Sequence, residues 1–242
     1  IPLRLVGSEM CIRDSISDSE NWPRLVQIAW QLHDDMGELI EVKNFIVRPE
    51  GFTIPYNAEK IHGISTKRAQ EQGVDLAFVL EEFNKAVSKS EFIVGHNIIF
   101  DINIMGAEFY RTQMETSLME EKNIDTKNEG TEFCAIPGGR GGKFKWPTLT
   151  ELHVKLFNEG FNEAHNASAD VEATTRCFLE LIRLRVINYQ RLGFDDKYNQ
   201  RFSECNSNPF ELLGLNIEPY KALDSEAEQQ DADVIILSLI HI

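Results

Sequence analysis

The sequence predicts an α/β protein in which a mixed sheet is flanked by helices. Two observations predict this class: residues 24–47 read as a pair of antiparallel strands, and alternating strands and helices follow them. A hairpin followed by such alternation gives a sheet with strands running in both directions. A chain of 242 residues is long enough to bury a core without disulfides or a structural metal.

The hairpin is predicted from alternation of apolar and polar side chains. Residues 24–33 alternate Val26, Ile28, Trp30 and Leu32 with Gln27, Gln31 and His33, which predicts a half-buried strand. A turn at 34–37 leads into residues 39–47, which also have period two.

Apolar spacing predicts the later elements. Short strands are expected at 91–94 and 123–126, and helices at 76–87, 98–109, 148–157 and 169–186. In the helix from 98, Ile98, Ile102, Met105 and Phe109 share one face.

Charge and cysteine content limit the class of protein. Lys and Arg number 24 and Asp and Glu 39, so the net charge of −15 excludes a protein that holds nucleic acid by bulk positive charge. It leaves open a site where metal ions bridge carboxylates to phosphate. Four scattered cysteines, no signal peptide and no apolar run of membrane-spanning length predict a cytoplasmic protein with no membrane segment.

Both ends of the chain differ from the rest. Residues 6–15 have no periodicity, and 234–242 form a bare apolar run without an expected partner. Both resemble translated sequencing-adapter read-through, so 1–15 and 234–242 are expected to be non-native; the alternative is that they are genuine termini. The expected domain is 16–189. Residues 190–233 are acidic and polar, which predicts a solvated linker or tail.

Two acidic residues take equivalent positions in the predicted elements. Asp101 lies in the first turn of the helix that follows strand 91–94, and Asp170 lies in the first turn of the helix at 169–186. Ligands of α/β sheets bind at the carboxyl ends of strands, where helix N-termini present N–H groups. Both residues are therefore candidates for a site. The alternative is that each only complements the helix dipole, worth about 0.3–1 kcal/mol.

His165 precedes Asp170 by five residues. Five positions on one helix correspond to about 500°, so the two side chains would point to different faces. We therefore expect His165 to lie on a loop before the helix, with its imidazole ring over Asp170. Asn166 or Ser168 is expected to cap the helix. A His beside metal-binding carboxylates suits a general base, because its pKa lies near neutral pH. The alternative is a loop His bonded to backbone.

These residues resemble two motifs of the DEDDh exonucleases, the 3′→5′ proofreading nucleases typified by the epsilon subunit of bacterial DNA polymerase III. The motifs are Val-Gly-His-Asn-x-x-Phe-Asp at 94–101 and His-x-Ala-x-x-Asp at 165–170. Residues 24–29, Ile-His-Gly-Ile at 61–64 and Asp125-Thr126 agree as well. The resemblance extends from about Asn21 to Arg185.

The resemblance implies a ribonuclease-H-like fold with a mixed five-stranded sheet and two divalent ions, Mg²⁺ or Mn²⁺. It implies that Asp101 and Asp170 bind metal and that His165 deprotonates the attacking water. The implied reaction hydrolyses the 3′-terminal phosphodiester of DNA and releases nucleoside 5′-monophosphates. The implied partners are a single-stranded or frayed DNA 3′ end and a DNA polymerase III alpha subunit, or a polymerase fused behind the domain.

This chain departs from the family at the first motif, which is Asp-x-Glu at the end of an apolar central strand. Asp18-Ser19-Glu20 has the spacing, but it lies six residues before Arg24 and no strand precedes it. We interpret it as part of a loop and expect the first, central strand to be missing or replaced, which would open the sheet. Two metal ions about 3.5–4 Å apart need several bridging carboxylates, so we expect a weakly active or inactive chain.

Further residues are candidates for contacts with substrate. Residues 138–145 form a Gly-rich basic loop in which Arg140 and Lys143 are expected to contact phosphates, and Phe144 or the following Trp146 to stack a base. The alternative is a mobile, solvated loop. His62, His96 and Asn97 match family turns near the substrate; for the two histidines the alternative is a structural role.

Two other functions stay open. One is an RNA-directed relative of the oligoribonuclease or RNase T type, since only sugar-edge contacts read the 2′-OH. The other is a catalytically degenerate exonuclease fold that binds single strands or a polymerase. A genuine absence of the first motif favours the second.

Overall fold

The computed structural model describes residues 16–17, 19–34, 37, 39–161, 166–187 and 234–241. Its centre is a five-stranded sheet in the order β2-β1-β5-β3-β4. The strands are β1 (Leu25–His33), β2 (Leu39–Ile46), β3 (Phe92–Gly95), β4 (Lys122–Asp125) and β5 (Val234–His241). β1 is antiparallel to both of its neighbours, while β5, β3 and β4 are parallel. The mixed sheet confirms the predicted fold class.

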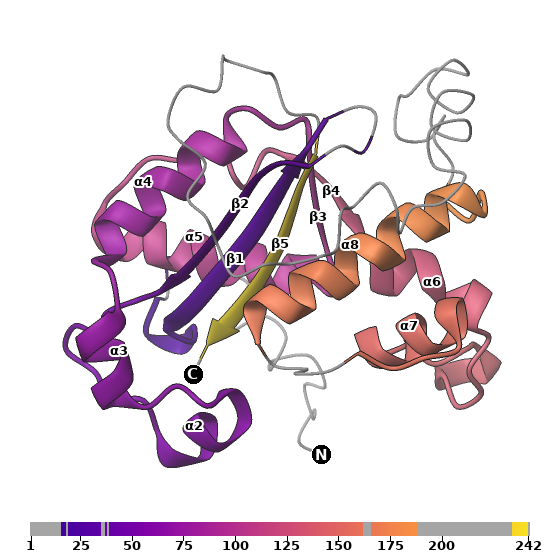
Figure 1. Ribbon diagram of the computed structural model, residues 1–242, viewed down its shortest axis with the longest axis horizontal. Helices are drawn as coiled ribbons and strands as arrows, with labels where there is room; N and C mark the ends of the chain where they lie inside the picture. Colours follow the sequence, from indigo (N-terminus) through magenta and orange to yellow (C-terminus); the bar gives the residue numbers. More distant parts are fainter. Residues whose placement is uncertain are drawn as a thin grey trace, which may run out of the picture.

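Helices cover both faces of the sheet (Figure 1). The α-helices of the described residues are α2 (Tyr56–His62), α3 (Thr66–Gln72), α4 (Leu76–Val87), α5 (Ile98–Thr112), α6 (Thr126–Cys134), α7 (Leu149–Phe157) and α8 (Ala167–Arg183). α8 crosses one face with α6 and α7 beside it, and α4 and α5 lie behind the other face. No helix in these ranges is both long enough and apolar enough to span a bilayer.

The predicted apolar faces of α4 and α5 are buried as expected. Ile98, Ile102, Met105 and Phe109 are at most 4% exposed and lie in one core cluster with Trp30 of β1. The period of 3.6 residues was therefore sufficient to identify these helices and the side that they bury.

The prediction that the first strand is half-buried was wrong, because all nine residues of β1 are buried. α8 covers the second face, where the polar side chains satisfy one another. Gln31 accepts a hydrogen bond from Thr175 of α8 at 2.8 Å. Gln27 donates to Asn44 of β2 at 2.9 Å, and Asn44 donates to Ser168 of α8 at 2.6 Å. Buried polar groups need such partners, and these bonds align α8 with β1 and β2.

The expectation that residues 234–242 have no partner is corrected by β5. This strand pairs with β1 on one edge and β3 on the other, so the central position is filled and the sheet is not open. Ile235, Leu237 and Leu239 join the core on the α4 and α5 side, and Ile236 joins the core under α7 and α8. An uninterrupted apolar run suits a strand buried on both faces. Residues 1–15 and 190–233 lie outside the described residues, and the expected domain boundaries remain predictions.

Candidate active site

Three parallel strands bring their carboxyl ends to one edge of the sheet. α5 begins after β3 and α6 begins directly after β4. The start of α8 reaches the same edge, because the N–H of Ala167 donates to Gln27, which pairs with Ile240 near the end of β5. Figure 1 shows α8 beginning close to the arrowhead of β5. Side chains from the first turns of α5 and α8 therefore meet at this edge.

Asp101 and Asp170 are brought together there, as the sequence predicted. Burial raises the pKa of the Asp101 carboxyl well above its usual range, and the carboxylates of Asp125 and Asp170 raise it further. Charges in the protein interior are screened less than exposed charges, so the three groups interact as one electrostatic cluster. Asp101 consequently keeps a proton at pH values where an exposed aspartate has lost it.

Asp125 is the member of this cluster that was not among the predicted site residues. It ends β4, is 8% exposed, and caps α6 by accepting the N–H of Lys127 at 3.0 Å. The same Oδ1 accepts the N–H of Asn97 at 2.9 Å. Asn97 is the N-cap of α5 with φ of 70°, a conformation that Asn tolerates better than most residues. Asp125 thus fixes the turn before α5, and the signal for it in the sequence was an Asp near the end of the predicted strand 123–126.

His96 links this turn to the segment before α7. Its Nε2–H donates to the carbonyl of Pro147 at 3.0 Å, and its Nδ1 lies 3.0 Å from the Thr126 hydroxyl. Burial lowers the pKa of the ring. Both ring nitrogens thus contact protein atoms, which favours the structural alternative for this histidine.

The remaining predicted residues lie in different surroundings. His165 falls outside the described residues, whereas Asn166 caps α8 by accepting the N–H of Ser168 at 3.1 Å, as one of the two predicted caps. His62 ends α2, and its Nδ1 accepts the N–H of Ile64 at 3.1 Å. Arg140 and Lys143 are exposed on the loop between α6 and α7.

This loop is closed by its own backbone. The N–H of Lys145 donates to the carbonyl of Ile136 at 2.8 Å. Gly139 lies so close to the other side of the loop that a Cβ there would be 2.3 Å from the carbonyl oxygen of Phe144. Glycine is therefore required at that position. The loop holds a defined shape that presents its side chains outward.

The described residues do not fit the two-ion site that the resemblance implies. They contain no group of three or more His, Cys, Asp or Glu side chains arranged to hold a metal ion. Two metal ions that share a site need several bridging carboxylates, and the expectation that Asp101 and Asp170 bind metal stays a prediction. β5, which occupies the central position, has the sequence Val-Ile-Ile-Leu-Ser-Leu-Ile-His and supplies none.

Comparison with known proteins identifies the family. Residues 23–178 match the exonuclease family, RNase_T, over more than half of the chain. The chain belongs to the exonuclease family. The match begins two residues before β1, includes Asp101 and Asp170, and ends at residue 178, within α8. No curated protein sequence matches the chain.

Solved structures of exonucleases share this fold. A structure of exonuclease I is 21% identical with a TM-score of 0.57, over 72% of this chain and 41% of that chain. E. coli exonuclease I in complex with a dT13 oligonucleotide is 20% identical with a TM-score of 0.57, over 73% and 41%. The zinc-bound form of the E. coli exonuclease I–ssDNA complex is 22% identical with a TM-score of 0.56, over 70% and 39%. This exonuclease-family chain thus has the ribonuclease-H-like exonuclease fold and spans about two fifths of these proteins.

Because Asp125 both caps α6 and accepts the N–H of Asn97, we expect it to contribute to the stability of the fold. Asp125→Ala removes the cap of α6 and leaves the N–H of Asn97 without its acceptor, so we expect the free energy of unfolding to fall by about 2 kcal/mol in urea. The control is Asp75→Ala. Asp75 also precedes a helix, but it makes no side-chain cap and pairs with Arg48 at an exposed site, so its loss should cost less than about 1 kcal/mol. Equal effects of the two substitutions would contradict the role of Asp125.

Proposed function

We propose that this chain is the catalytic domain of a 3′→5′ exonuclease of the proofreading type that acts on DNA. The observation that carries the proposal is the convergence of Asp101 and Asp170, from the starts of α5 and α8, within a chain of the exonuclease family. The oligonucleotide complexes of exonuclease I support a DNA strand as the substrate class. His165, which precedes α8 in the sequence, is the proposed general base that deprotonates the attacking water.

This chain is proposed to be weakly active or inactive. Its central strand brings no carboxylate to the edge where Asp101 and Asp170 meet. A site with two carboxylates binds a pair of divalent ions less well than a site with further bridging carboxylates. This observation also favours the second candidate, an exonuclease fold that binds single strands or a polymerase without cutting. A polymerase III alpha subunit or a fused polymerase remains the proposed protein partner.

An assay of strand shortening tests the proposed activity. With Mg²⁺ or Mn²⁺ present, the unaltered chain is expected to shorten a 5′-labelled deoxyoligonucleotide weakly or not at all, as measured on a denaturing gel. A version with 234–242 deleted and an apolar strand ending in Asp-x-Glu placed ahead of Trp22 is expected to release single nucleotides from the 3′ end.

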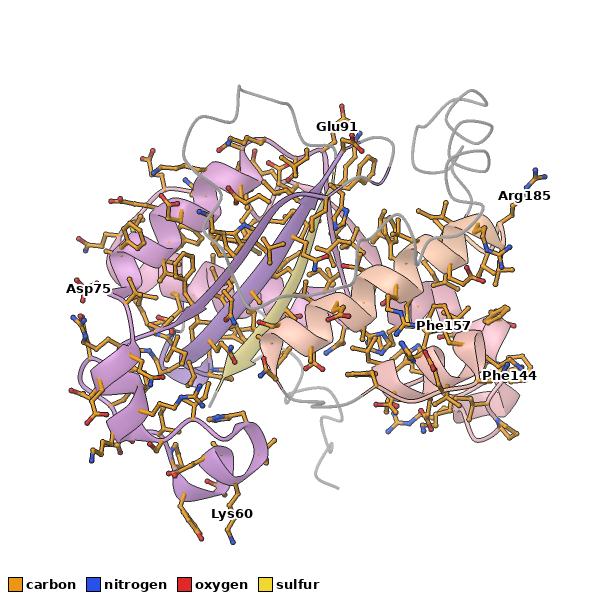
Figure 2. All side chains as sticks on the ribbon, in the orientation of Figure 1. Lys60, Asp75, Glu91, Phe144, Phe157 and Arg185 are labelled. Carbon is orange, nitrogen blue, oxygen red and sulfur yellow. The ribbon has the colours of Figure 1, made fainter. Side chains whose placement is uncertain are left out.

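Site variants decide how this assay is interpreted. In the repaired chain, Asp101→Ala and Asp170→Ala should each abolish shortening, while Asp75→Ala, at the outer edge of the molecule, should not (Figure 2). Robust cutting by the unrepaired chain that is lost with Asp101→Ala would contradict the predicted inactivity. A folded but inactive repaired chain would reject the exonuclease and favour the binding module.

Arg140 and Lys143 are proposed to bind substrate phosphates. Replacing both with Ala should weaken binding of a labelled oligodeoxynucleotide and flatten the dependence of log affinity on log salt by about 1.4, since each phosphate contact to a single strand contributes about 0.7. Lys89→Ala with Arg185→Ala is the control; it makes the same charge change after α4 and after α8, away from the proposed site. An unchanged slope in the Arg140 and Lys143 variant would reject their role.

A further inference from the structure

Trp146 differs from the other two tryptophans of the chain in its exposure. Trp22 is 6% exposed and Trp30 is fully buried, whereas Trp146 is 63% exposed. A tryptophan buries more apolar area than most side chains when it packs, so an indole held in solvent loses stabilisation that a buried position would give.

The ring is held in place on one side by Lys127. The Lys127 ammonium lies 4.6 Å from the centroid of the Trp146 ring, within the range of a cation–π interaction. The same ammonium donates to Oδ1 of Asn97 at 2.6 Å. The backbone next to the ring is also fixed, because the carbonyl of Pro147 accepts the His96 bond described above. Trp146 is therefore an ordered, exposed ring rather than a free side chain.

These contacts place the ring beside the candidate site. Asn97, which Lys127 touches, is the N-cap of α5, and Asp101 follows four residues later. Four residues of helix correspond to about 6 Å along the axis. Phe144, the other aromatic residue of the loop, is 39% exposed and lies at the outer edge of the molecule on the α6 and α7 side (Figure 2). Of the two predicted stacking residues, Trp146 is the one connected to the start of α5.

The segment that carries the ring is positively charged, which favours an anionic ligand. Residues 136–147 contain three cations and no carboxylate, in a chain with a net charge of −15. One cation, Lys145, pairs with Glu151 at 2.8 Å, while Arg140 and Lys143 are exposed. An exposed aromatic ring beside cations is the combination that binds single-stranded nucleic acid, since bases stack on the ring and phosphates meet the cations.

We propose that Trp146 stacks a base of a single-stranded DNA whose 3′ end lies at Asp101 and Asp170. The inference rests on the proposed function and adds a residue that binds the strand by stacking. Lys127 covers one face of the indole and orients it toward the strand. The indole then holds a nucleotide near the start of α5 by stacking, without reading its sequence, because every base has a face that stacks.

Fluorescence of the full chain tests this proposal without relying on cutting. In EDTA, where no hydrolysis is expected, the oligodeoxynucleotide dT8 is titrated while tryptophan emission and the anisotropy of an end-labelled dT8 are measured. Because Trp22 and Trp30 are buried, dT8 is expected to quench the emission of Trp146 saturably. Trp146→Leu should abolish this quenching and weaken the binding of labelled dT8 by roughly tenfold.

Two further variants separate stacking from other effects. Trp146→Phe keeps an aromatic face and should recover most of the affinity. Tyr110→Leu removes an exposed ring, 53% accessible, near the other end of α5 and should leave the affinity unchanged. Binding of dT8 with the same affinity by wild type and Trp146→Leu would reject the stacking role while the proposed function stands. No binding of dT8 by the wild-type chain would reject both.

Discussion

The backbone pairing of β5 with β1 and β3 joins the two halves of the sheet. β1 pairs with β2 on one side, β3 pairs with β4 on the other, and β5 is the strand between them. Two-stranded units are marginally stable in water, so neither half is expected to persist alone. The side chains of β5 also enter the cores on both faces, which fixes α4 and α5 on one side and α8 on the other. The positions of both candidate carboxylates depend on this arrangement.

β5 completes the sheet, but it does not supply the carboxylates that the candidate metal site lacks. β5 ends at the edge where α5 and α8 begin, yet its sequence offers apolar, Ser and His side chains and no carboxylate. Asp101, Asp125 and Asp170 remain as an acidic cluster, in which burial and then the two neighbouring carboxylates raise the pKa of Asp101. Of these three, Asp125 accepts hydrogen bonds from the backbone N–H groups of Asn97 and Lys127, so it positions the start of α5 and of α6.

Local patterns in the sequence predicted the parts of this structure that depend on local physics. The spacing of Ile98, Ile102 and Met105 identified α5 and its buried face, and the positions of Asp101 and Asp170 in first helical turns predicted their meeting. The sequence did not predict that β1 is buried on both faces, because this depends on α8, which packs against it from far along the chain. The partners of β5 were missed for the same reason: pairing between distant segments leaves no periodic signal in either one. Asp125 looked like a strand end, and its second bond, to Asn97, exists only in the folded chain.

Native-state hydrogen exchange of residues 235–239 tests most directly whether β5 is the central strand. The amides in this stretch are expected to exchange only through global unfolding, with protection equal to that of the β1 core around Trp30, because a central strand opens only when the sheet does. The edge strand β2 should exchange faster. Exchange of residues 235–239 within seconds, while β1 stays protected, would contradict the placement of β5 and the account of the site built on it.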